Sequence, residues 1–147
     1  MAIFSKTCEH AMRAVLYLAQ TNAANSRFGI KDIAIEIGSP ELYLGKILQD
    51  LSRKGLIGSA KGPNGGFFMT PEMRSKPLID IVKAVDGEDL FLNCGLGLKQ
   101  CSELNPCPLH NQFKAIRANI TAMLSEKTID AFSGEMMDRM LNLKKTI

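Results

Sequence analysis

The sequence contains no run of about 18 apolar residues, so we expect no membrane-spanning helix. Its first residues also lack the charged leader and apolar run of a secretory signal, and we therefore expect a cytoplasmic protein. Disulfides are rare in that compartment, where clustered cysteines more often bind metal or do redox chemistry. We therefore expect the cysteines of this chain to be metal ligands or redox groups.

The motifs of common enzyme classes are missing as well. The chain has no phosphate-binding loop, no dinucleotide-binding fingerprint and no pairing of a nucleophile with a base, so we expect no enzyme. The net charge of +3 is small and alone does not indicate a nucleic-acid partner. From Lys46 to Lys61, however, four cationic residues stand against one acidic residue, so the basic bias is local.

The segment from Ile30 to Thr70 has the most informative pattern. Two runs of apolar residues at helical spacing are joined by a short turn. We expect Gly38 to end the first helix, Ser39 to cap the second, and Pro40 to occupy its first position. A helix pair joined by such a turn is typical of a helix-turn-helix. The apolar runs are Ile30, Ile33, Ala34 and Ile37, then Leu44, Ile47, Leu48 and Leu51.

A glycine-rich hairpin is expected directly after the second helix, which Gly55 should end. Leu56 and Ile57 open a predicted strand, the segment 61–66 has the residues of a tight turn, and Phe67 to Met69 form the returning strand. Such a hairpin would be the wing of a winged helix-turn-helix domain, which we place at residues 1–87.

This pattern predicts a surface that binds double-stranded DNA. A helix fits the major groove, where side chains near its N-terminus reach base edges, and a hairpin tip can place a cation in the minor groove. The alternative is that these polar residues are only solvated faces of a folded core. The candidate DNA-binding residues are Ser39, Pro40, Glu41, Tyr43, Lys46, Gln49 and Arg53 on the helix and Lys61, Gly62, Asn64 and Gly65 on the wing.

Two further helices complete the predicted first domain. The N-terminal one runs from Ser5 to about Thr21 and is apolar nearly all round, so we expect it to be central. Pro71 to Pro77 is predicted as a loop. The apolar residues from Leu78 to Val85 predict a short helix that ends at Asp86 and Gly87.

The segment 88–111 contains the second informative pattern. Cys94, Cys101, Cys107 and His110 are spaced C-x6-C-x5-C-x2-H among glycines, asparagines and prolines that oppose regular structure. A loop can bring several thiolates to one centre, and thiolates select iron–sulfur clusters, zinc or copper(I). The close CxxC pair of structural zinc sites is absent, which favours a cluster, either 2Fe-2S or 4Fe-4S.

The segment 108–147 is predicted to hold a dimerisation helix and a C-terminal helix. A stripe of apolar residues suits a partner helix, and dimeric helix-turn-helix proteins bind two half-sites. The alternative is that the same stripe belongs to the core of one chain. We expect Thr128 to cap a short turn, and a last helix after Gly134 that includes several methionines. The candidate dimer residues are Phe113, Ile116, Ile120 and Leu124.

Together these motifs resemble the IscR/NsrR-type family of bacterial transcription regulators. The resemblance covers nearly the whole chain. It implies a homodimeric winged helix-turn-helix factor, such as a repressor, that binds a palindromic operator. It also implies an iron–sulfur cluster near the dimerisation helix whose response to iron, oxidants or nitric oxide sets the DNA affinity. The matching parts are Ala11, Ala14 and Leu18, the run 39–44, the positions Leu48, Leu51 and 55–57, the wing 61–66, the run 81–87, and the three-cysteine loop.

The fourth ligand of such a cluster is left open between several groups. His110 lies three residues after Cys107 at the start of a helix, and the resemblance includes a histidine after the third cysteine. Glu9 is an alternative, because some members of the family recruit a carboxylate from the first helix across the dimer. Cys8 and an external ligand are further alternatives, although Cys8 also fits a small buried apolar residue.

The sequence therefore predicts a mainly α protein with a small β-hairpin, built as a winged helix-turn-helix domain plus a long dimerisation helix. The function that fits best is regulation of transcription by a cluster-sensing, DNA-binding homodimer without membrane association. The alternative is a winged-helix regulator with a zinc site or a thiol-based redox switch and no cluster.

Overall fold

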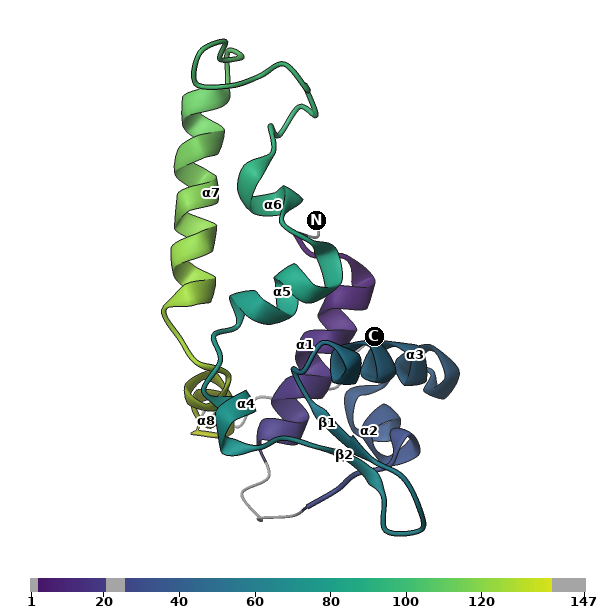
Figure 1. The fold of residues 1–147 in the computed structure, drawn as a ribbon. Coiled ribbons are helices and arrows are strands. Elements are labelled where there is room, and N and C mark those ends of the chain that lie inside the picture. Colours follow the sequence, from purple (N-terminus) through teal and green to yellow (C-terminus); the bar gives the residue numbers. More distant parts are fainter. Residues whose placement is uncertain (1–2, 21–25, 139–147) are drawn as a thin grey trace.

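The computed structural model describes residues 3–20 and 26–138, and it confirms a mainly helical fold with one small hairpin (Figure 1). No helix in this described part is long and apolar enough to cross a membrane. The elements in chain order are α1 (Lys6–Ala19), α2 (Ile30–Ile37), α3 (Glu41–Arg53), β1 (Gly58–Ala60), β2 (Gly66–Phe68), α4 (Pro71–Arg74), α5 (Ile79–Asp86), α6 (Asp89–Leu92), α7 (His110–Ser125) and α8 (Ile129–Asp138).

Helix α1 is the centre of the fold, as predicted from its apolar sequence. Ser5 caps it by accepting a hydrogen bond from the Cys8 amide at 3.0 Å. Helices α2, α3, α5 and α8 all pack against it. Its buried residues are Cys8, Ala11, Ala14, Val15, Leu16, Leu18 and Ala19, and small residues on this face let the neighbouring helices approach closely.

The helix-turn-helix forms where it was predicted, with one correction at the turn. Gly38 ends α2 in the left-handed conformation, at φ 67°. Ser39 does not cap α3, because Pro40 occupies the cap position and makes no side-chain capping bond. The Ser39 hydroxyl is instead buried, and it has no hydrogen-bond partner among the described residues.

The wing is shorter than predicted and is tied to the chain before α2. Strands β1 and β2 pair antiparallel, with Ser59 opposite Phe67. Phe28 forms an additional bridge to Phe67, with backbone hydrogen bonds of 2.8 and 3.0 Å. Leu56 and Ile57 precede the strand instead of opening it, because both side chains are buried in the core.

Two connections differ from the sequence predictions. The predicted loop 71–77 contains helix α4, which is capped by Thr70 and has Pro71 in its first turn. Gly134 does not separate a turn from a last helix, because α8 runs through it, while Thr128 caps that helix through the Ala131 amide as expected. The predicted helix beyond Asp138 lies outside the described residues.

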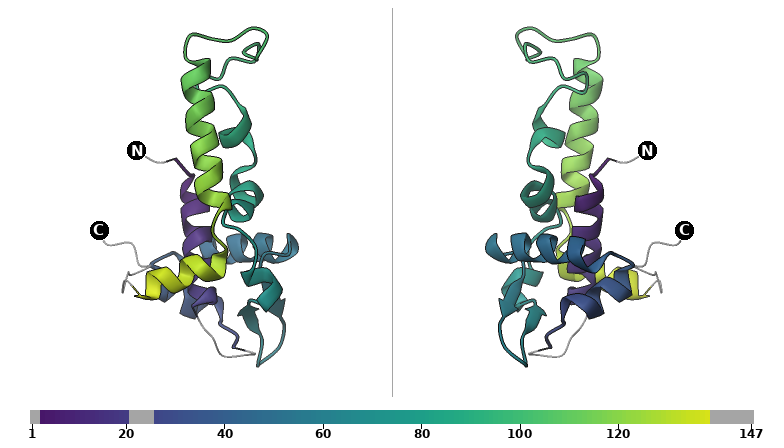
Figure 2. Two further views of the ribbon diagram at one scale, coloured as in Figure 1. Left: turned by 90° about the vertical axis from the view of Figure 1, so that its left-hand side faces the viewer. Right: turned by 90° about the vertical axis from the view of Figure 1, so that its right-hand side faces the viewer.

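Helix α7 gives the molecule its elongated shape. Figures 1 and 2 show the 93–109 loop at the far end of α7 and the hairpin at the opposite end of the molecule. The base of α7 is held by Leu124 and Ile129, which are buried in the core. It is also held by a bridge between Pro77 and Thr128 that links the segments before α5 and after α7.

The predicted dimer stripe lies on one face of α7, and most of that face is covered within the chain itself. Leu124 is only 4% exposed within one chain, and Ile120 is partly buried against the same core. Phe113 packs beside Gly95, where a Cβ would lie 2.3 Å from the phenyl ring. Only Ile116, at 52% exposure, still points outward. The intramolecular alternative therefore holds for Leu124.

The position of Leu124 gives a prediction about stability. Leu124→Ala should lower the free energy of unfolding by about 2–5 kcal/mol, because it removes buried methyl groups at the base of α7. Leu104→Ala is the matched control: that leucine is 97% exposed, and its change should stay within about 0.5 kcal/mol. Urea unfolding of both variants at one protein concentration tests this, and equal effects would contradict the assigned core.

Candidate metal centre and DNA-binding face

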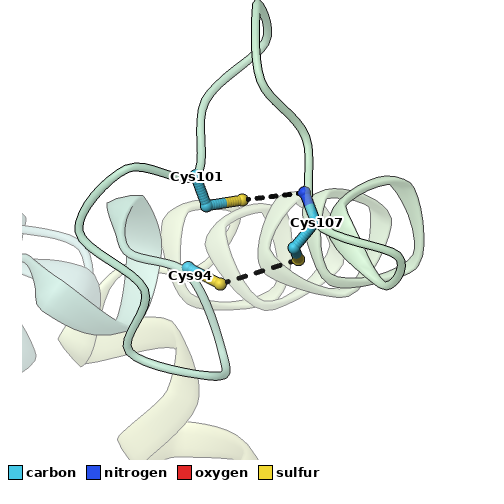
Figure 3. A group of neighbouring side chains, drawn as sticks. All are labelled: Cys94, Cys101 and Cys107. Atoms are coloured by element: carbon cyan, nitrogen blue, oxygen red, sulfur yellow. Dashed lines mark hydrogen bonds between the residues drawn. The ribbon is translucent and has the colours of Figure 1, made fainter.

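Three cysteines meet at the far end of α7. Cys94 follows α6, Cys101 lies in the loop, and Cys107 precedes α7. Their sulfur atoms all lie within 4.8 Å of one another, and within the described ranges these cysteines are the group that could hold a metal (Figure 3). The structure thus brings together the three thiols that the sequence singled out.

Local contacts of the loop with α7 position these thiols. Gly95 allows the loop to pass over the Phe113 ring, because any larger residue there would collide with it. Arg117 donates a hydrogen bond to the carbonyl of Asn93 at 3.1 Å, which ties the start of the loop to the middle of α7. The Cys107 amide donates to the sulfur of Cys101 at 3.3 Å and so joins the middle of the loop to its end before α7.

The thiols of Cys94 and Cys107 differ in their ionisation. Backbone amides of Leu98 and Leu96 lower the pKa of Cys94 to about 7, because they donate hydrogen bonds to its sulfur. Desolvation raises the pKa of Cys107. The sulfurs of Cys94 and Cys107 are 3.8 Å apart.

His110 lies beside the thiol group at the first position of α7. Its Nδ1 is 3.3 Å from the Cys101 sulfur, and the side chain is buried. Its Nε2 faces the Glu103 carboxylate at 3.4 Å, although without hydrogen-bond geometry. Lys114 holds the same carboxylate at 2.6 Å and thereby lowers the pKa of Glu103. The sequence prediction missed Glu103, and its place between two cysteines was the only available signal.

The alternative ligands on α1 are not part of this group. Cys8 is fully buried in the core, and burial together with Asp86 raises the pKa of its thiol to about 12. This environment matches the small buried apolar residue weighed from sequence and disfavours a thiolate ligand. Glu9 is partly exposed in the first turn of α1 and does not belong to the thiol group within one chain.

The donor set fits a thiolate-selective centre. Three sulfurs within 4.8 Å, with an imidazole beside them, match the ligands that iron–sulfur clusters, zinc and copper(I) select. An open hollow of about 420 Å³ borders Cys101 and Cys107. Small molecules in solvent can therefore reach these sulfurs, which a buried structural site would prevent.

The outer face of α3 is the candidate major-groove surface. Glu41, Lys46, Gln49 and Arg53 are exposed, as expected for residues opposite the buried apolar stripe. Tyr43 is partly exposed and also contacts α1. Its hydroxyl lies 2.7 Å from the Thr7 hydroxyl, and its ring packs edge-on against His10, so it joins α3 to α1.

The wing presents the predicted cation at its tip. Lys61, Gly62 and Asn64 are exposed, whereas a Cβ at Gly65 would lie 2.2 Å from the carbonyl of Ala60 and would break the turn. The sequence prediction missed Arg27, which lies over the Phe68 ring and donates a hydrogen bond to the Asn64 carbonyl at 3.4 Å. This second exposed cation adds to the positive charge of the wing.

Comparison with known proteins identifies the chain. The Rrf2 family model, described as an iron-dependent transcriptional regulator, matches residues 4–135. The chain belongs to the Rrf2 family. A protein of Aquifex aeolicus named as an HTH-type transcriptional regulator is 28% identical over 145 residues, which cover 97% of this chain and 94% of that protein.

Solved structures of Rrf2-type regulators have the same fold. CymR of B. subtilis, titled the global cysteine regulator, superposes with a TM-score of 0.75 at 19% identity, covering 92% of this chain and 98% of CymR. IscR of T. potens superposes with a TM-score of 0.72 at 21% identity, covering 93% and 90%. This Rrf2 protein is therefore a winged-helix transcriptional regulator that binds DNA, and it is not an enzyme.

The thiols of this Rrf2 protein should differ in reactivity in the metal-free state. Iodoacetamide should label Cys94 first, because a thiolate is the reacting form and the Cys94 pKa of about 7 makes it available near neutral pH. Its labelling rate should rise with pH through this value. Cys8 should react only after unfolding, and rapid native labelling of Cys8 in mass spectra would contradict its assigned environment.

Proposed function

We propose that this Rrf2 regulator binds an iron–sulfur cluster through Cys94, Cys101 and Cys107, and that the state of the cluster sets its affinity for DNA. The observation that carries the proposal is the convergence of three sulfurs within 4.8 Å at the end of α7, beside His110. When bound, the cluster would supply a centre that responds to iron supply, oxidants or nitric oxide.

We assign the fourth ligand to His110. Its Nδ1 is on the side of the thiol group, 3.3 Å from the Cys101 sulfur, and its Nε2 is on the far side, 3.4 Å from the Glu103 carboxylate. Burial limits the motion of the ring. A nitrogen ligand binds iron less tightly than a thiolate, so this corner would be where a signal molecule attacks first. Glu9 of a second chain remains the alternative that the experiment below distinguishes.

The DNA surface is proposed to combine α3 and the wing. Helix α3 would enter the major groove with Lys46, Gln49 and Arg53, and Lys61 would enter the minor groove. These side chains are exposed, and both α3 and the hairpin lie away from the 93–109 loop (Figure 1). Two such surfaces in a dimer would read a palindromic operator.

The dimer is proposed to form through the outward face of α7. Ile116 and Met123 on this face are both about half exposed, and Ala115 and Ala122 lie beside them in exposed positions. Residues at 115, 116, 122 and 123 share one side of a helix, so a second α7 could pack along them. Of the four dimer residues predicted from the sequence, Ile116 is the one that lies on this face.

A thiol switch without a cluster is the second candidate. The 3.8 Å separation of the Cys94 and Cys107 sulfurs favours it, because a bond between them needs only a small movement to about 2.05 Å. Forming that disulfide would release two protons and pass two electrons to an oxidant. The fold resemblance to CymR is compatible with both candidates, the thiol switch and the iron–sulfur cluster.

The two candidates predict different purified proteins. Protein handled without oxygen should be coloured and contain iron and sulfide if the cluster is present, whereas colourless protein with zinc or with free thiols supports the second candidate. Serine at Cys94, Cys101 or Cys107 should abolish the visible absorption. Cys8→Ser is the matched control and should retain it, because Cys8 is buried away from the site.

The same spectra identify the fourth ligand. His110→Ala should give a cluster with altered absorption and a shorter lifetime in air. If His110→Ala instead matches the unmodified protein while Glu9→Ala loses the cluster, then the ligand comes from α1 and our assignment is wrong.

The proposed dimer face is tested by oligomeric state. Ile116→Glu should convert a dimer into a monomer, because it would bury an unpaired carboxylate between the two helices. Ile35→Glu on α2 is the control: Ile35 has similar exposure but lies away from α7, so this variant should stay dimeric. Analytical ultracentrifugation at micromolar concentration measures both, and a dimeric Ile116→Glu protein would reject the face.

A further inference from the structure

An exposed leucine lies at the start of the proposed recognition helix. Leu42 is 88% exposed, although it belongs to the first turn of α3. The sequence prediction did not include it among the DNA-binding residues. A single exposed leucine on a protein surface needs no explanation by itself. The position of this one within α3 is what makes it informative.

Leu42 shares a stripe with the polar residues proposed to face DNA. Residues 42, 46, 49 and 53 recur at helical spacing, so Leu42, Lys46, Gln49 and Arg53 lie along one line of α3. That line is opposite the buried line of Leu44, Leu48 and Leu51. All four side chains of the outer stripe are exposed. A helix that enters the groove with this stripe must bring Leu42 against the DNA.

The chemistry of Leu42 restricts what it can recognise there. Its side chain has no hydrogen-bond donor or acceptor, so it cannot pair with the polar edge of a base or with a phosphate. The major groove has one apolar feature among the natural base pairs, the C5-methyl group of thymine. Residues near the N-terminus of a recognition helix are the ones that reach base edges. Leu42 is the second residue of α3.

We propose that Leu42 is a specificity-determining residue that contacts a thymine methyl group in each operator half-site. This inference rests on the proposed insertion of α3 into the major groove, and it adds a base preference to that surface. Burying a methyl group against the leucine should favour thymine over a pyrimidine without the methyl by about fourfold per contact.

The test removes each partner of the proposed contact separately. The probe is a duplex selected by the unmodified protein from a random DNA pool, and each thymine of a half-site is replaced in turn by uracil, which differs only by lacking the methyl. For the unmodified protein, one replacement should weaken binding by about fourfold per half-site. For Leu42→Ala, the same replacement should have no effect, because the methyl has lost its partner.

Two control variants separate this inference from the proposed function. Leu104→Ala removes an equally exposed leucine at the opposite end of the molecule and should keep the full sensitivity to uracil. Lys46→Ala should weaken binding to all duplexes and retain the same sensitivity to uracil.

If Leu42→Ala remains as sensitive as the unmodified protein at each thymine, or if the unmodified protein is insensitive at all of them, the thymine contact is rejected. If Lys46→Ala also has no effect on binding, α3 is not the DNA-binding face and the proposed function fails at that point.

Discussion

The burial of α1 is the constraint on which the rest of the structure depends. Its small and aliphatic residues let α2, α3, α5 and α8 pack around one helix, so the helix-turn-helix and the base of α7 share a single core. Polar bonds add to this packing: Ser5 binds the Asp86 carboxylate at the end of α5, and the buried Ser133 hydroxyl of α8 donates to the Leu16 carbonyl. A displacement of α1 would therefore shift the helices that pack against it, which include α2 and α3 of the helix-turn-helix.

This arrangement decides how the cysteine loop could influence DNA binding. The loop and the wing lie at opposite ends of the molecule, so no side chain can contact both (Figure 1). The physical connection runs from the loop through α6 and α7 to α5, and from α5 through α1 to α3. Lys54 at the end of α3 also donates to the Ala84 carbonyl of α5 at 2.5 Å. Movement of α7 relative to α5 is therefore the route by which the site could alter the position of α3.

The sequence predicted the helices and strands well, but it predicted less well which residues pack against each of them. Periodicity identifies which face of a helix is apolar, and it placed α2, α3, α5 and the three cysteines correctly. It does not reveal what covers that face, so Leu124 was assigned to a second chain although its own core buries it. Periodicity also does not show that Tyr43 joins α3 to α1, because that contact depends on where the neighbouring helix lies. Glu103 was missed because its approach to His110 depends on the path of the cysteine loop, which periodicity does not describe.

The central claim is that the centre at Cys94, Cys101 and Cys107 controls binding of DNA by a surface at the other end of the molecule. The most direct measurement is the operator affinity of one anaerobic preparation, determined before and after its metal centre is removed by a chelator at constant salt. A coupled regulator should show a change of about 5- to 150-fold, the usual range for communication between two sites. Equal affinities for the loaded and the stripped dimer would contradict the account.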